Sequence, residues 1–241
     1  MIKFFRKTRQ RLLTENKIRN YLLYSIGEIL LIFIGVIIAI SATQWKNNRE
    51  ESTYEKEALN EIYKGLQTDY AKLEVIITST EKGINRIKIL DSLLKQEIPV
   101  YKSSFDTLFG AVYGFRFFSM EKANYEDLKM NSLNLIKNSA LRRQLIVVFE
   151  SGYSTNEKDY EIELWVNDII RPYYLENFRN LRFSESATPL QYEELWGDSY
   201  YKNIVDYRLT FLKGVLVRDH KRLKNEMEKL ITLIEEYTEV K

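Results

Sequence analysis

The chain has 241 residues, of which 45% are hydrophobic and 29% charged, and it contains nine glycines, three prolines, one histidine and no cysteine. The low glycine and proline content favours long helices over a turn-rich β protein, and the lack of cysteine excludes a disulfide scaffold, a thiol nucleophile, a zinc ribbon and a lipidated cysteine. The net charge of +2 is unevenly divided, because residues 1–20 hold seven basic residues and one acidic residue. The rest is therefore acidic, which argues against nucleic-acid binding.

The basic N-terminal tail, residues 1–20, has two interpretations. Residues 2–13 place apolar side chains on one side at helical spacing, as in an amphipathic helix that lies on an anionic membrane surface. Alternatively, the charge serves only to orient membrane insertion. In both cases we expect the basic side chains to face membrane lipid: Lys3, Arg6, Lys7, Arg9, Arg11, Lys17 and Arg19.

The one long apolar run, YLLYSIGEILLIFIGVIIAISA, covers residues 21–42. As a helix it measures about 33 Å, enough to cross the hydrocarbon core of a bilayer, so we predict a transmembrane helix over residues 21–45. The positive charge that precedes the run orients the N-terminus toward the cytoplasm and the remainder away from it. An uncleaved anchor is favoured over a signal peptide, despite the small residues Ala39 and Ser41, because the run exceeds the usual length of about 7–15 apolar residues.

Glu28 is the only charged residue within this apolar run. It could lie at the inner interface without a partner, hydrogen-bond to another helix, or carry protons. The second interpretation is favoured, because several residues on the same broad helix face are small and let helices approach closely. The predicted packing face consists of Gly27, Glu28, Gly35, Ala39 and Ala42, and it would contact another membrane protein or a second copy of the chain.

Residues 46–241 read as one helical domain. Apolar side chains at three- and four-residue steps predict long helices over about 53–96, 139–170 and 198–237, the last with Asp198 as its N-cap. The first helix either restarts at Thr53, within a capping box, or continues the membrane helix without a break. Helices of this length pack antiparallel in a bundle.

Shorter helices are predicted between the long ones. Phe105 begins one that ends near Gly114, Asn124 caps another, and Thr188 before Pro189 caps a third. Few strands are expected. The predicted fold is all-α: one N-terminal transmembrane helix followed by a helical-bundle-like extracytoplasmic domain.

The N-terminal forty residues and the stretch YEDLKMNSLNLIKNSALRRQL, residues 125–145, resemble a family of short single-pass bacterial envelope proteins of unknown function. Members of that family have a basic tail, a span that opens on Ile-Gly-Glu and a helical periplasmic domain. The chain departs from the family near Ser132, where a glycine is common, and at Thr43-Gln44-Trp45, where Asn-Asn-Trp is common. The resemblance implies a bacterial inner-membrane protein and supplies no catalytic residue.

The residues give little support to catalysis. His220 lies among charged neighbours and is expected on a solvated helix face, and the acidic pairs Glu161/Glu163 and Glu193/Glu194 are expected to be solvated as well. Neither a di-iron pattern nor a glycine-rich phosphate loop occurs. We therefore expect no enzyme, metal or cofactor.

Aromatic and basic residues in two stretches are candidates for a ligand or partner patch, with core packing as the ordinary alternative. They are Phe105, Phe109, Tyr113, Phe115, Arg171, Tyr173 and Tyr174. The sequence favours a membrane-anchored interaction or assembly subunit, with its N-terminus in the cytoplasm and its helical domain in the periplasm. A ligand-sensing domain that signals through the membrane helix is the alternative.

Overall fold

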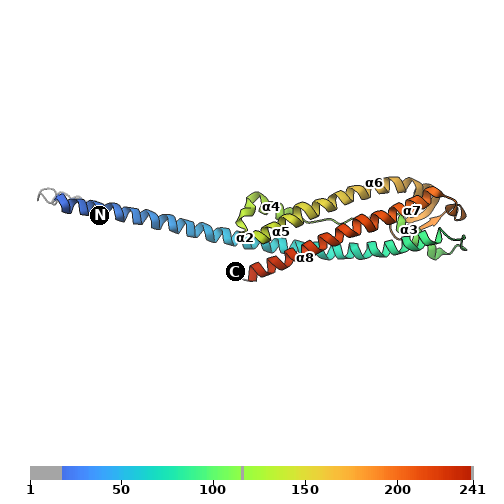
Figure 1. Cartoon of the computed structure of the whole chain (residues 1–241), viewed down its shortest axis with the longest axis horizontal. Coiled ribbons are helices and arrows are strands. Elements are labelled where there is room, and N and C mark those ends of the chain that lie inside the picture. The colour runs from blue at the N-terminus through green and yellow to red at the C-terminus, as the bar shows by residue number, and fades with distance from the viewer. Residues whose placement is uncertain (1–17, 115–116, 240–241) are drawn as a thin grey trace. The chain divides into compact units, whose positions relative to one another are not determined.

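The computed structural model describes residues 18–114 and 117–239 (Figure 1). The chain divides into two compact units, residues 1–55 and 56–241, and each is described by itself. The fold is all-α, as predicted, with two short strands among the described residues. In chain order the elements are α2 (Ile18–Leu93), η1 (Ser103–Phe105), α3 (Asp106–Val112), α4 (Ala123–Ser132), η2 (Leu133–Leu135), α5 (Ser139–Ile146), η3 (Val147–Gly152), α6 (Tyr153–Asn177), β1 (Phe178–Arg182), β2 (Ser186–Pro189), η4 (Glu193–Trp196), α7 (Ser199–Phe211), η5 (Leu212–Leu216) and α8 (Val217–Glu239).

The described part of the first unit is the beginning of α2. Neither glycine nor proline occurs between Trp45 and Glu55, so no residue type there interrupts the helix. The hydroxyl of Thr53 donates to the carbonyl of Arg49 at 3.0 Å, which is an interaction within a helix rather than a cap. The predicted restart at Thr53 is therefore wrong, and the alternative, a continuous helix, is what α2 forms.

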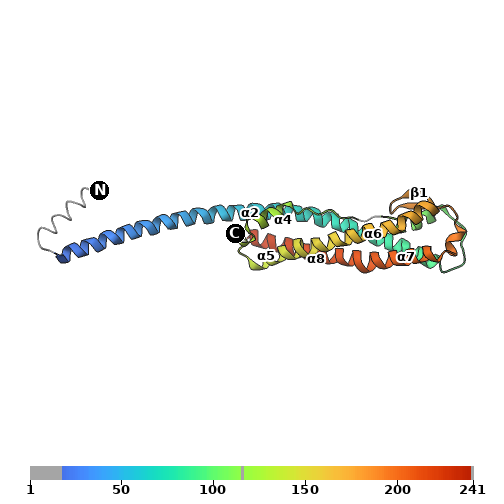
Figure 2. The same ribbon diagram turned by 90° about the horizontal axis from the view of Figure 1, so that it is seen from above.

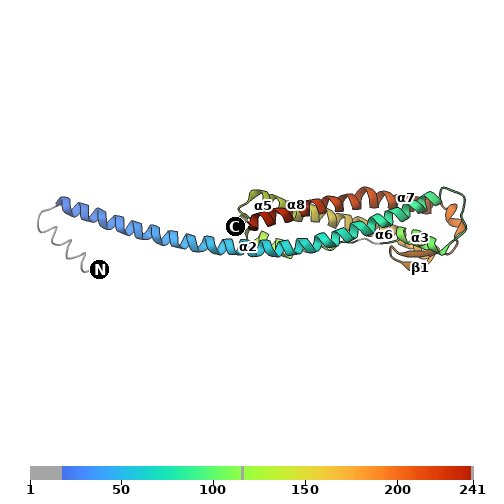
Figure 3. The ribbon, with the colours of Figure 1, turned by 90° about the horizontal axis from the view of Figure 1, so that it is seen from below.

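The second unit is a bundle of three long helical segments that lie side by side (Figures 2 and 3). They are the second part of α2, the run from α5 through the π-helical turn η3 to α6, and the run from α7 through the π-helical turn η5 to α8. Lys224 pairs with Glu74 at 2.8 Å and Lys221 with Glu81 at 2.6 Å, so α8 runs antiparallel to α2. Because α6 also runs antiparallel to α7 and α8, α2 and α6 point the same way. The chain between them must return along the bundle.

The core follows the predicted apolar stripes closely. The buried members on α2 and just after its end are Leu59, Ile62, Leu66, Leu73, Ile87, Leu90 and Leu94. On the last segment they are Leu212, Leu216, Leu223 and Leu230. Ile76 is only partly buried, and Ile77 takes its place in the core. Two polar residues that interrupt the α2 pattern, Asp69 and Thr80, are fully buried as well.

Helix boundaries depart from the predictions where local signals were misleading. The helix expected to end before Pro172 continues to Asn177, because Pro172 is on the exposed side and the carbonyl that it leaves without a donor can bond water. Ile169, predicted to be in the buried stripe, is exposed. Asn124 lies inside α4 instead of capping it, and its amide donates to the carbonyl of Glu61 at 3.5 Å.

Side-chain capping occurs at two other helix starts. The carboxylate of Asp198 accepts from the backbone N–H groups of Tyr200 and Tyr201 at 2.7 and 3.1 Å, which confirms the predicted cap of α7. Asn138 caps α5 in the same way, through the N–H groups of Ala140 and Leu141.

The third short helix, expected from Pro189 onward, is reduced to the 3₁₀ turn η4, and its predicted cap lies in a β-hairpin instead. Strands β1 and β2 pair antiparallel, with an irregularity between Arg179 and Arg182. Thr188 does not cap a helix, because it lies within β2 and its hydroxyl donates to the carboxylate of Asp106 at 2.6 Å. The hairpin packs on α3, and Gly110 makes that contact possible, since a Cβ there would lie 2.3 Å from the backbone nitrogen of Ser186.

Replacing Gly110 by alanine should lower the midpoint of thermal unfolding, because the hairpin backbone would have to move away from α3. Overpacking of this kind costs about 1–3 kcal/mol. Gly214→Ala is the matched control: nothing lies within 4 Å of the Cβ it would add, so it should leave stability unchanged or raise it by up to about 1 kcal/mol. Circular dichroism melting of the full chain in detergent measures both. Equal effects of the two substitutions would contradict this account of the hairpin contact.

Candidate functional site

No described residue of the chain covers the predicted packing face of α2. Glu28, Gly35 and Ala42 are spaced seven residues apart, which places them on one side of a helix, and Gly27 and Ala39 lie beside them. A Cβ added at either glycine would meet nothing within 4 Å. The apolar side chains around this face are exposed too, and Glu28 is partly exposed.

By length and composition, α2 is the one helix in the described part of the chain that could cross a membrane. The predicted lipid-facing residues of the tail, Lys3, Arg6, Lys7, Arg9, Arg11 and Lys17, lie outside the described residues. Arg19 lies at the start of α2.

A row of buried polar side chains on α6 is the second candidate. Asn156, Asp159, Glu163 and Asn167 recur at steps of three or four residues and lie on the face of α6 that points into the bundle. A buried polar group without a hydrogen-bond partner costs free energy, so the partners of this row decide what it does.

Glu163 forms a fully buried ion pair with Arg208 of α7. The two guanidinium N–H groups donate to the two carboxylate oxygens, both at 2.6 Å. Arg208 also donates to the carbonyl of Gly114 at 2.8 Å, and Asn167 donates to the same carbonyl at 3.4 Å. The expectation that Glu163 is solvated is therefore wrong. Its ion pair with Arg208 fixes the backbone at Gly114 inside the bundle.

His220 is buried, with 2% of its surface exposed, so its predicted place on a solvated face is wrong. Its Nε2 lies 2.9 Å from the amide oxygen of Asn156, and the amide nitrogen of Asn156 donates to the carbonyl of Phe118 at 3.2 Å. Since an amide oxygen only accepts, Nε2 carries the proton and donates. Burial lowers the pKa of His220 to about 4, so the ring is neutral at pH 7.

Asp69 of α2 holds the same returning segment from the other side. Its Oδ2 accepts from the backbone N–H of Glu121 at 2.8 Å and from the hydroxyl of Tyr153 at 2.9 Å. Side chains of α2, α6 and α7 thus hold the backbone at Gly114, Phe118 and Glu121, where helix or sheet bonds are missing. Most of the buried polar row therefore has a structural task.

Asp159 is the member of the row that this task does not explain. It is buried, and its Oδ2 has no hydrogen-bond partner among the described residues. Burial and, to a smaller extent, the charge of Asp219 raise the pKa of Asp159 to about 6, while Arg218 opposes the shift. A carboxyl with such a pKa changes its charge near neutral pH.

The candidate aromatic patch lies largely in the core. Phe109, Tyr113 and Tyr174 are buried, so they offer no surface to a ligand or partner. Tyr174 stacks on Phe178 with centroids 4.3 Å apart and donates to the carbonyl of Phe109 at 2.9 Å. Of the other members, Phe105 and Tyr173 are partly buried against the same core, Arg171 is exposed and Phe115 lies outside the described residues.

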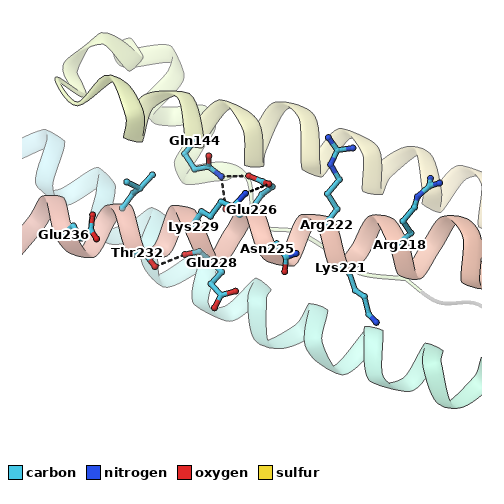
Figure 4. Close-up of a pocket in the computed structure, with 11 residues that line it drawn as sticks. Gln144, Arg218, Lys221, Arg222, Asn225, Glu226, Glu228, Lys229, Thr232 and Glu236 are labelled. Carbon is cyan, nitrogen blue, oxygen red and sulfur yellow. Dashed lines mark hydrogen bonds and ion pairs between the residues drawn. The ribbon is translucent and has the colours of Figure 1, made fainter.

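A groove of about 870 Å³ follows α8 (Figure 4). Its charges largely neutralise one another. Glu226 accepts from Gln144 and Lys229, both at 2.8 Å, and these bonds lower the pKa of its carboxyl. Arg218 is paired with Asp219 at 2.9 Å. This surface has the properties of a solvated helix face.

Metal chemistry finds no support in the described residues, where no three His, Cys, Asp or Glu side chains gather to hold an ion. Comparisons with protein-family models, curated proteins and solved structures find no match to this chain.

Removing Arg208 should destabilise the fold strongly. Arg208→Leu leaves Glu163 as an unpaired buried charge, and breaking a buried pair in this way costs about 3–5 kcal/mol. Arg218→Leu is the control, since the side chain of Arg218 is 65% exposed, and an ion pair whose cation is solvated in this way contributes at most about 1 kcal/mol. Urea unfolding of the full chain in detergent gives both values. A loss below about 1 kcal/mol for Arg208→Leu would refute the proposed clamp.

Asp159→Asn should stabilise the protein at pH 8 and have no effect near pH 4. The folded-state pKa of about 6 lies above the ordinary value of 3.8, so the carboxyl contributes stability below pH 3.8 and loses it as pH rises through 6. Removing the charge should therefore recover about 1–3 kcal/mol at pH 8. His220 has the opposite dependence, because its pKa is lowered. Melting temperatures from pH 4 to 8 measure the effect, and a difference that is independent of pH would contradict it.

Proposed function

We propose that this protein is a single-pass membrane subunit that associates with another membrane protein, or with a second copy of itself, through the span in α2. The proposal places the N-terminus in the cytoplasm and the helical domain in the periplasm of a bacterial inner membrane. It assigns no catalytic activity. The basic tail supports this orientation, because positively charged residues are retained on the cytoplasmic side.

The observation that carries the proposal is the uncovered face of Glu28, Gly35 and Ala42 on an exposed apolar helix. A carboxyl at the centre of a lone membrane helix costs about 2.5–3.5 kcal/mol on insertion scales. A partner helix that approaches over the small residues brings hydrogen-bond donors to Glu28 and reduces that cost. Lipid alone supplies such groups only near the headgroups.

The test is co-purification of the full chain from membranes in mild detergent. Glu28→Ala and Gly35→Leu should each reduce recovery of a stoichiometric partner, or of a self-associated form, by about tenfold or more, because a loss of about 1.4 kcal/mol is already tenfold. Ile37→Phe, which adds bulk away from the packing face, is the control and should retain the association. Resistance to alkaline extraction should be the same for all variants.

Two outcomes would overturn the proposal. In the first, Glu28→Ala and Gly35→Leu leave every association intact. In the second, alkaline extraction releases the wild-type chain, or its mature form begins near Ala42.

A further inference from the structure

A second surface cavity lies in the helical unit, where α2 faces the hairpin turn between β1 and β2. It has a volume of about 460 Å³ and is lined by Ile76, Ser79, Lys82, Gly83, Arg86, Phe117, Phe183 and Ser184. Two cations, two hydroxyls and two aromatic rings thus surround one space, and none of the lining residues is acidic.

The positive charges of the two cations have no acidic partner among the described residues. Lys82 and Arg86 are one helical turn apart on α2, and neither forms an ion pair with a described residue. Like charges at this spacing repel each other. Other lysines of the same helix do have acidic partners: Lys72 pairs with Asp69 at 3.3 Å and Lys64 with Glu61 at 2.7 Å. The cavity therefore concentrates positive charge that no described acidic residue neutralises.

Ser184 lines the cavity in an unusual backbone conformation. Its φ is 60°, in the left-handed region that few non-glycine residues adopt, and its N–H donates to the carbonyl of Tyr113 at 2.8 Å. Its Oγ is buried and lacks a hydrogen-bond partner among the described residues. Gly114 leaves room for this arrangement, since a Cβ there would clash with the hydroxyl.

The aromatic rings are exposed yet held in place. Phe183 is 59% exposed and stacks on buried Tyr113, with centroids 4.9 Å apart. Phe117 is 45% exposed and packs against Tyr160, with ring centroids 4.5 Å apart. Together with Ile76, these rings give the cavity an apolar wall beside its cations.

We propose that this cavity binds a small soluble organic anion, in which a carboxylate or phosphate group is joined to an apolar or aromatic portion. Arg86 offers the planar fork that matches such oxyanions, and Lys82 adds a second positive charge. The hydroxyl of Ser79 already donates to the carbonyl of Ile76 at 3.0 Å, so the two cations supply the donors to the oxyanion. The exposed faces of Phe117 and Phe183 cover the apolar portion, as aromatic side chains do in ligand pockets. This site is independent of the proposed association through the membrane span.

The test uses the full chain in a non-ionic detergent and phenyl phosphate as the probe, with calorimetric titration as the readout. Wild-type protein should bind phenyl phosphate more tightly than inorganic phosphate and should not bind neutral benzyl alcohol. Lys82→Gln with Arg86→Gln should weaken binding by about tenfold to a hundredfold, the range for lost charge-assisted bonds. Lys88→Gln, an exposed lysine of the same helix outside the cavity, should not change it.

Phe183→Ser separates the apolar contribution from the charge. It should reduce the affinity for phenyl phosphate toward that for inorganic phosphate and leave the latter unchanged. Absence of binding at millimolar probe would overturn the proposal, as would equal binding by the double variant or by benzyl alcohol. Equal affinities of wild-type protein for phenyl phosphate and inorganic phosphate would also overturn it. Circular dichroism of each variant confirms that the fold is retained.

Discussion

The ion pair between Glu163 and Arg208 is the interaction on which the helical unit depends. Two parallel helices, α2 and α6, can be joined only if the chain travels back along the bundle, and its described residues there, Gly114 and 117–121, lie outside regular structure. A non-helical segment packed against a bundle brings carbonyls and N–H groups that no helix satisfies. Arg208 donates to the carbonyl of Gly114, and Asn156 donates to the carbonyl of Phe118. Asp69 accepts from the N–H of Glu121. The buried charges are the consequence of this topology.

The same constraint separates what the sequence predicts from what it does not. Apolar residues at helical spacing predicted the core stripes of α2 and α8. The cap at Asp198 could be predicted as well, because capping is a local interaction. The roles of Glu163 and His220 could not be predicted, because their partners are distant in sequence: Glu163 is 45 residues from Arg208, and His220 is 64 residues from Asn156. A polar residue on an otherwise apolar face looks like an interruption until its partner is known. Asp69 and Thr80 are examples, since both interrupt the pattern and both are buried.

The two candidate sites also differ in how far they can be identified from the sequence alone. The face of Glu28 and Gly35 could be identified from one helix, because its spacing is contained in the apolar run. The cavity at Lys82 and Arg86 combines α2, the returning segment and the hairpin turn, which are far apart in the chain. Its most informative property is that no described acidic residue pairs with Lys82 or Arg86, and only the folded arrangement reveals this. The groove along α8 is larger and also charged, yet most of its charges find partners, so size alone is a poor guide to function.

The order of the elements also bears on how the protein is made. Synthesis produces α2, the returning segment and α6 before α7, so Glu163 emerges from the ribosome well ahead of the arginine that neutralises it. Until α7 arrives, the carbonyl of Gly114 and the carboxylate of Glu163 must remain hydrated, and the groove between α2 and α6 cannot close. The last two helices therefore seal the bundle, and a nascent chain that stops before Ser199 is expected to be a substrate for chaperones or proteases.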